Sequence, residues 1–132
     1  MPNAVLLPPA IALPEKLALA LAAGSPLVVM VSLEGCPFCK IVRESYLVPM
    51  RQEQGLPVVR SQRSVKNFNG LATTHEALVA AWRIGLAPAV AFFGRQGVEV
   101  AQRLVGGYIP DFYGAYLEQH LDLARRAIAK AV

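Results

Sequence analysis

Cys36 and Cys39 are the residues whose type and spacing point most directly to chemistry. They are the only cysteines in the chain, and Pro37 and Phe38 separate them. The apolar, β-branched run before them predicts a strand buried on both faces, and the spacing after them predicts a helix. Cys36 would begin this helix, and Cys39 would lie on the same side, able to close a ring with Cys36. This arrangement predicts thiol–disulfide exchange, in which Cys36 attacks and Cys39 resolves the mixed disulfide.

The start of the predicted helix favours an anionic sulfur. Its backbone N–H groups have no intrahelical partners, and the helix dipole is positive there. We therefore expect the pKa of the Cys36 thiol to fall from about 8.5 to between about 5.5 and 7.5. Pro37 suits the first turn because it has no N–H to lose. Phe38 gives the thiolate no cationic help and Glu34 opposes it, so the predicted shift is moderate.

Two less reactive interpretations of the cysteine pair remain open. Half a zinc site would need two more ligands, and only His75 and His120 are left, without finger-like spacing to each other. A structural pair without redox activity would leave the same pattern. Both histidines fit surface or packing positions better than catalytic ones, so no metal site is predicted.

The composition limits the protein class and its partners. The chain has 132 residues, 55% hydrophobic and 17% charged, which predicts one folded domain rather than a disordered segment. The net charge is +4, but the basic residues between positions 40 and 66 alternate with apolar ones. They predict a solvated face and no nucleic-acid partner. We expect no transmembrane segment, because charges or prolines interrupt every long apolar stretch.

The N-terminal half predicts a helix, a strand, a second helix and a second strand. Residues 1–12 are expected to form an irregular arm before a single domain over residues 13–132. Gly24 is expected to take a left-handed conformation after the first helix. Pro49 is expected to kink or restart the second helix. The predicted elements are a helix over 13–24, a strand over 27–33, a helix over 37–55, a strand over 56–62 and a loop over 64–72.

The C-terminal half predicts a helix, a hairpin and a long final helix. Thr73 and Glu76 form a capping-box pattern for a helix ending near Trp82. Strands are expected over 86–93 and 98–105, the second with strict alternation, joined by a turn over 94–97. The last helix is expected to open at Pro110 and Asp111. Its predicted apolar side comprises Phe112, Tyr116, Leu117, His120, Leu121 and Ala124.

This order of elements predicts an α/β fold. A strand–helix–strand unit favours a parallel pair with a right-handed crossover, and the late hairpin adds an antiparallel pair. The expected architecture is a central mixed sheet of four to five strands with helices on both faces.

The chain resembles the thioredoxin superfamily over about residues 13–124. The resemblance rests on the strand and C-P-F-C motif of Val28–Cys39, on Trp82–Pro88 before an apolar strand, and on the hairpin of Phe93–Gly106. It implies a thioredoxin fold, a cis Ala87–Pro88 peptide bond facing the cysteines, and a groove where the backbone of Ala87 receives a substrate chain. It implies no cofactor beyond the redox-active disulfide.

The sequence departs from cytosolic thioredoxins near the cysteines. Met30 stands where those proteins have a buried aspartate, so Glu34 or water would have to replace that proton acceptor. Ala87 replaces the usual Thr, Val or Ile. The segment Glu34–Lys40 is most similar to the disulfide-interchange proteins of the bacterial envelope. That similarity slightly favours the periplasm over the cytoplasm. The apolar N-terminus as given is not expected to be a signal peptide. A chain whose leader had been replaced by Met1 would have the same sequence, so the compartment stays open.

The expected function is a thiol:disulfide oxidoreductase that acts on protein thiols and receives electrons from a thiol donor. The neutral Phe38 favours reduction of substrates over oxidation. Two alternatives stay open: a non-catalytic binding module that uses the same groove, and a glutathione-linked, glutaredoxin-like reductase.

Overall fold

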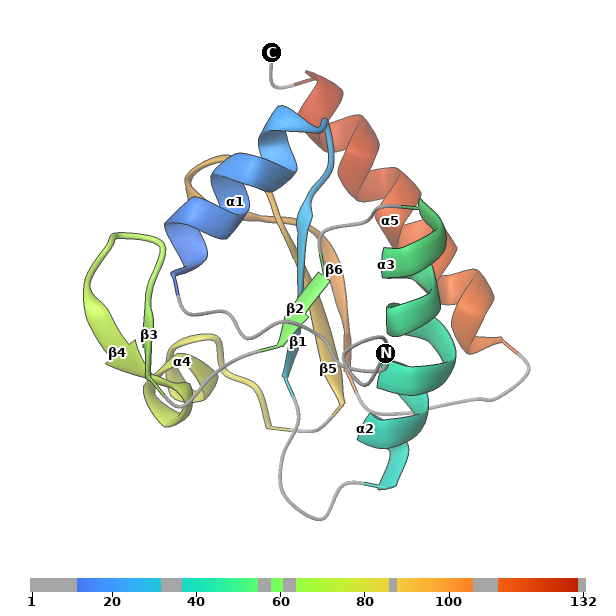
Figure 1. Cartoon of the computed structure of the whole chain (residues 1–132), viewed down its shortest axis with the longest axis horizontal. Coiled ribbons are helices and arrows are strands. Elements are labelled where there is room, and N and C mark those ends of the chain that lie inside the picture. The colour runs from blue at the N-terminus through green and yellow to red at the C-terminus, as the bar shows by residue number, and fades with distance from the viewer. Residues whose placement is uncertain are drawn as a thin grey trace.

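A computed structural model describes residues 12–31, 37–54, 58–60, 64–85, 88–105 and 112–130 (Figure 1). Its centre is a four-stranded sheet in the order β2-β1-β5-β6. The strands are β1 (Leu27–Val31), β2 (Val58–Arg60), β5 (Ala89–Phe93) and β6 (Glu99–Val105). β1 is parallel to β2 and antiparallel to β5, and β5 is antiparallel to β6. The prediction of a mixed sheet is confirmed.

β1 is a central strand, as its continuous apolar sequence predicts. Each of its five residues is buried, and the same holds for the five residues of β5. Both strands have a hydrogen-bonded neighbour on each side and helices over both faces, so each alternate side chain meets apolar partners.

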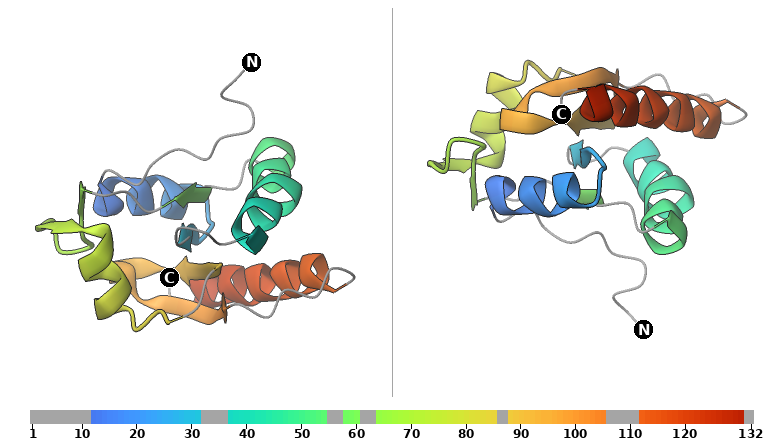
Figure 2. Two further views of the ribbon diagram at one scale, coloured as in Figure 1. Left: turned by 90° about the horizontal axis from the view of Figure 1, so that it is seen from below. Right: turned by 90° about the horizontal axis from the view of Figure 1, so that it is seen from above.

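Helices cover the two faces of the sheet (Figure 2). One face packs against α1 (Leu13–Ala22) and α4 (His75–Ala81). The other face packs against α5 (Tyr113–Lys130) and a helical stretch made of α2 (Pro37–Val42), a π-helical turn η2 (Arg43–Leu47) and α3 (Val48–Gln54). The prediction of helices on both faces is confirmed.

The helix over residues 37–54 continues through Pro49 instead of stopping there. In a regular α-helix the ring of Pro49 would clash with the carbonyl of Ser45. The π-helical turn lies directly before this point, and the N–H of Val48 bonds the carbonyl of Arg43, five residues back. The wider turn changes the register of the carbonyls around the proline, so the chain keeps its helical direction.

The prediction of a loop over residues 64–72 is wrong, because this segment contains strand residues. β3 (Ser64–Lys66) and β4 (Ala72–Thr74) form an antiparallel two-stranded sheet. The side chain of Asn67 closes the turn by accepting hydrogen bonds from the N–H groups of Asn69 and Leu71. The strands are too short and too polar to produce an alternating apolar pattern.

The helix ends follow the expected chemistry, with one change of position. Gly24 follows α1 with a φ of +75°, which confirms its left-handed role. The cap of α4, however, is Thr74 and not Thr73. The Thr74 hydroxyl accepts from the N–H of Ala77 at 3.1 Å. Thr73 belongs to β4, where it pairs with Val65, so strand pairing moves the start of the helix by one residue.

The prediction of strict alternation in β6 is wrong. The pairing with β5 shifts register twice, so Val100, Ala101 and Leu104 all pack against one core cluster. A β-bulge adds a residue to one strand and redirects the side chains that follow it.

The predicted apolar side of α5 is also partly wrong. Phe112 is 55% exposed and Tyr116 is 42% exposed. The helix begins at Tyr113, and this residue starts the buried stripe. Its members are Tyr113, Leu117, Leu121, Ala124 and Ile128.

Candidate functional site

Cys39 lies in the first turns of α2, the helix that follows the central strand β1 along the chain. Its side chain is 4% exposed, and the residue is disulfide-bonded. Pro37 begins the helix, as predicted. Cys36 and Glu34 lie outside the described residues, so the attacking role of the first and the proton-accepting role of the second stay predictions. The predicted strand-then-helix setting of Cys39 is confirmed.

An apolar cluster surrounds Cys39. Its members include Met30 from β1, Val42 from α2 and Val90 from β5. Met30 is 1% exposed, so the position where cytosolic thioredoxins have an aspartate is a core position here. Within the described ranges no charged or polar residue is buried. The described surroundings of Cys39 therefore contain no buried carboxylate that could take its proton.

The outer side of α2 presents apolar side chains beside the buried sulfur. Phe38 is 46% exposed and Ile41 is 38% exposed, whereas Cys39 and Val42 face the core. This division follows the helical period, because residues three apart lie on one side. Phe38, predicted to line the substrate groove, is therefore accessible at the surface.

The start of β5, which follows Pro88, lies at the same end of the sheet as the start of α2 (Figure 1). Pro88 is buried and directly precedes β5. Ala89 pairs with Val31, the last residue of β1, and Cys36 follows Val31 by five positions in the sequence. This register places the start of β5, and with it Pro88, beside the end of β1. Ala87 lies outside the described residues, so the cis peptide bond stays a prediction.

Aromatic packing holds the helix of Cys39 against α5. The rings of Tyr46, in the π-helical turn, and Tyr113, at the start of α5, have centroids 5.3 Å apart. The sequence does not predict this contact. Its only signal was a tyrosine in each helix, and no sequence rule pairs residues so far apart.

The two histidines lie in α5 and at the start of α4. His120 is half-buried and its Nδ1 donates to the backbone carbonyl of Gln102 in β6. His75 is half-buried at the start of α4. Among the residues described, no group of three or more His, Cys, Asp or Glu side chains could hold a metal ion. The helices described here are also too short or too polar to span a membrane.

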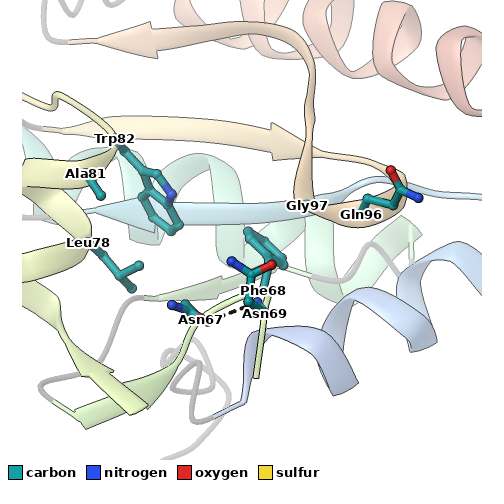
Figure 3. Close-up of a pocket in the computed structure, with 8 residues that line it drawn as sticks. All are labelled: Asn67, Phe68, Asn69, Leu78, Ala81, Trp82, Gln96 and Gly97. Carbon is teal, nitrogen blue, oxygen red and sulfur yellow. Dashed lines mark hydrogen bonds between the residues drawn. The ribbon is translucent and has the colours of Figure 1, made fainter. Parts of the chain in front are cut away.

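A pocket of about 260 Å³ lies on the α1 and α4 side of the sheet. The side chains of Leu78 and Trp82 point toward Phe68 there, and Gln96 points away (Figure 3). Asn67, Asn69, Ala81 and Gly97 complete the lining. Cys39 belongs to the core cluster of the other face, so this pocket is separate from the cysteine site. The sequence does not predict this pocket.

The family assignment follows from residues 13–121, which match the thioredoxin-like domain family. The chain belongs to this family. The match includes the strand before the cysteines, both cysteines, Pro88 and the first half of α5. A search of the curated proteins found no match.

Solved thioredoxin structures share the fold. Mitochondrial thioredoxin 3 from Saccharomyces cerevisiae aligns with a TM-score of 0.57 and 14% identity, over 88% of this chain and 93% of that one. A poplar thioredoxin h aligns with a TM-score of 0.54 and 22% identity, over 80% of this chain and 85% of that one. A thioredoxin from Nicotiana alata aligns with a TM-score of 0.55 and 16% identity, over 85% and 92% of the two chains. The predicted thioredoxin fold is confirmed.

Proposed function

We propose that this protein is a thiol:disulfide oxidoreductase that uses Cys36 as the attacking sulfur and Cys39 as the resolving sulfur. One observation carries the proposal: Cys39 is buried and disulfide-bonded in the first turns of the helix after the central strand. The sequence contains one other cysteine, Cys36, three positions earlier. The family assignment and the apolar exposed side of α2 support the same function.

The proposed reaction is two successive exchanges. The Cys36 thiolate attacks one sulfur of a substrate disulfide, and the other substrate sulfur leaves as a thiolate that takes a proton from water. Cys39 then loses its proton and attacks the Cys36 sulfur of the mixed disulfide. The substrate leaves as a dithiol, and the protein keeps the Cys36–Cys39 disulfide. A dithiol donor restores the reduced protein by the reverse sequence.

The surroundings of Cys39 suit a resolving sulfur. An apolar cluster disfavours a free thiolate, so Cys39 stays neutral until the mixed disulfide forms beside it. Glu34 or a water molecule is the proposed acceptor of its proton, since Met30 occupies the usual aspartate position. The helix start favours the thiolate at Cys36 instead.

The proposed substrates are protein disulfides that lie across the groove between Phe38 and Pro88. The exposed ring of Phe38 offers apolar contact on one side. For the other side we propose that the backbone of Ala87, the residue before the buried Pro88, forms strand-like hydrogen bonds with the substrate. The neutral Phe38 favours the reducing direction. We propose a periplasmic setting from the similarity of Glu34–Lys40 to envelope disulfide-interchange proteins.

The proposal is tested by measuring whether the protein catalyses the reduction of insulin disulfides with dithiothreitol as the electron donor. The wild type is expected to accelerate precipitation of the reduced insulin chains, and Cys36→Ser is expected to abolish this acceleration. Cys39→Ser should instead accumulate a mixed disulfide with the substrate, detectable by mass. Arg126→Gln, on the exposed side of α5, is the matched control and should keep full activity.

Two other results would replace the proposal. A wild type that binds substrate proteins without turnover would indicate a binding module. Turnover restricted to small glutathione mixed disulfides would indicate a glutaredoxin-like reductase.

A further inference from the structure

Arg103 of β6 joins the hairpin to the end of α4. Its Nε donates to a carboxylate oxygen of Glu99 at 2.9 Å, and its Nη2 donates to the other oxygen. Its Nη1 donates to the backbone carbonyl of Trp82. The Arg103 side chain is 20% exposed and the Glu99 side chain is 31% exposed. Glu99 therefore fixes the orientation of the guanidinium through Nε and Nη2, and the remaining nitrogen, Nη1, binds the backbone at the end of α4.

A β-bulge directs Arg103 toward α4. Val90 pairs with Leu104 and Phe92 pairs with Ala101, so one residue of β5 faces two residues of β6 between these pairs. The extra residue in β6 redirects the side chains around it. The carbonyl of Gln102, next to Arg103, is bound by His120 from the opposite face of the sheet. Both sides of the bulge are thus fixed by side-chain hydrogen bonds.

The carbonyl of Trp82 lies at a point where the backbone changes direction. Trp82 is the C-cap of α4, and Arg83 follows it with a left-handed φ of +55°. The N–H groups of Arg83 and Ile84 bond the carbonyls of Ala80 and Val79, in the pattern of a Schellman motif. Those bonds leave the carbonyl of Trp82 for Arg103.

The indole of Trp82 fixes the same point from the other side. Its ring lies 5.0 Å from the ring of Phe93 in β5. Residues 83–87 then lead from this anchored position to Pro88. The α4 end of the segment is therefore attached to both β5 and β6, and the other end continues directly into β5.

We propose that Arg103, held by Glu99, is a positioning residue that fixes Arg83–Gly85, the beginning of the segment before Pro88, and thereby supports the substrate groove. This inference rests on the proposed function. Arg103 contacts Trp82, which lies at the other end of this segment from Pro88. We therefore expect Arg103 to affect the binding of an extended substrate chain. Reaction of the Cys36 sulfur with a small disulfide needs no such groove.

The test compares insulin with the small aromatic disulfide 5,5′-dithiobis(2-nitrobenzoate) in steady-state assays. Arg103→Gln removes the positive charge and the paired guanidinium donors to Glu99, and Arg103→Lys keeps the charge but not the paired donors. For both variants we expect KM for insulin to rise on the order of tenfold, with kcat changed by less than about twofold. The reaction rate with the small disulfide should stay within about twofold of the wild type. Glu99→Gln should raise KM in the same direction by a smaller factor.

Arg126→Gln is the matched control, because Arg126 also pairs with an acid four residues away, Asp122, at 3.0 Å. It should leave both substrates unaffected. Thermal unfolding followed by circular dichroism gives the Tm of each variant, and all assays are run below it. If Arg103→Gln does not fold, the test is made with Arg103→Lys alone. An unchanged KM for insulin, or equal losses with both disulfides, would overturn the inference and leave the proposed function standing. A wild type without insulin turnover would overturn both.

Discussion

Gly97 offers a quantitative test of how the β5–β6 turn packs against the β3–β4 turn. Gly97 has a φ of +71°, and a Cβ added there would lie 2.6 Å from both Cβ and Cδ2 of Phe68. The Phe68 ring in turn lies 4.7 Å from the ring of Phe93. Rotation of the ring cannot relieve the contact, because Cβ is fixed to the backbone. Gly97→Ala therefore forces one of the two turns to move.

Gly24→Ala is the matched control for backbone strain. Gly24 has a φ of +75°, but a Cβ added there meets no atom within 4 Å. A left-handed alanine costs about 1 kcal/mol at either position. Overlap with a packed side chain adds about 1–3 kcal/mol at Gly97 alone. The expected losses of unfolding free energy are thus about 1 kcal/mol for Gly24→Ala and about 2–4 kcal/mol for Gly97→Ala.

Thermal and urea unfolding measure this difference. For a chain of 132 residues, each kcal/mol lowers Tm by about 3–4 °C. Gly24→Ala should lower Tm by about 3–4 °C and Gly97→Ala by about 6–16 °C. Insulin reduction by the folded fraction should be unchanged in Gly24→Ala, because the added Cβ meets no atom within 4 Å. Equal losses in the two variants would refute the packing argument.

Substitutions at three further positions have expected effects on stability. Thr74→Ala removes the cap of α4 and should cost about 1 kcal/mol, whereas Thr74→Ser, which keeps the hydroxyl, should cost less than half of that in urea unfolding. Arg83→Gly relieves a left-handed backbone and should raise Tm by about 2–4 °C, and an unchanged or lower Tm would contradict this. Leu121→Ala, fully buried in α5, should cost about 2–5 kcal/mol; a loss below about 1 kcal/mol would show that the helix is not packed on the sheet as described.

The features that the sequence predicted well depend on long, regular patterns. The apolar run of Leu27–Val31 has no polar interruption, so a buried central strand was the consistent interpretation. The setting of Cys39 followed from that strand and from the helical spacing after it. Gly24 was predictable because few other residues adopt a left-handed conformation without strain.

The features that the sequence does not predict depend on contacts between distant segments. The bulges in β6 are set by how β5 and α5 pack, and the alternating residues Val98–Val105 contain no sign of them. β3 and β4 have three residues each, too few for a period to be visible. The hydrogen bond from Arg103 to Trp82 joins positions 21 residues apart in the sequence, and neither residue type indicates the other.

The start of the last buried stripe was missed for a more local reason. Phe112 and Tyr116 fit a helical spacing as well as Tyr113 and Leu117 do. Only the packing of Tyr113 against Tyr46 selects the second set. Periodicity alone could not choose between two overlapping apolar faces.

The reduction potential of the cysteine pair is the most direct test of the central claim. The protein is equilibrated with graded ratios of reduced and oxidised dithiothreitol or glutathione, quenched with acid and labelled with a maleimide, and the two redox forms are counted by mass. Exchange through Cys36 and Cys39 predicts a single reversible two-electron transition between about −270 and −120 mV, in the lower half of that range if the protein is a reductant. Cys36→Ser and Cys39→Ser should each abolish the transition. Two thiols that stay reduced throughout this range, or a disulfide that no donor in it can reduce, would contradict the account.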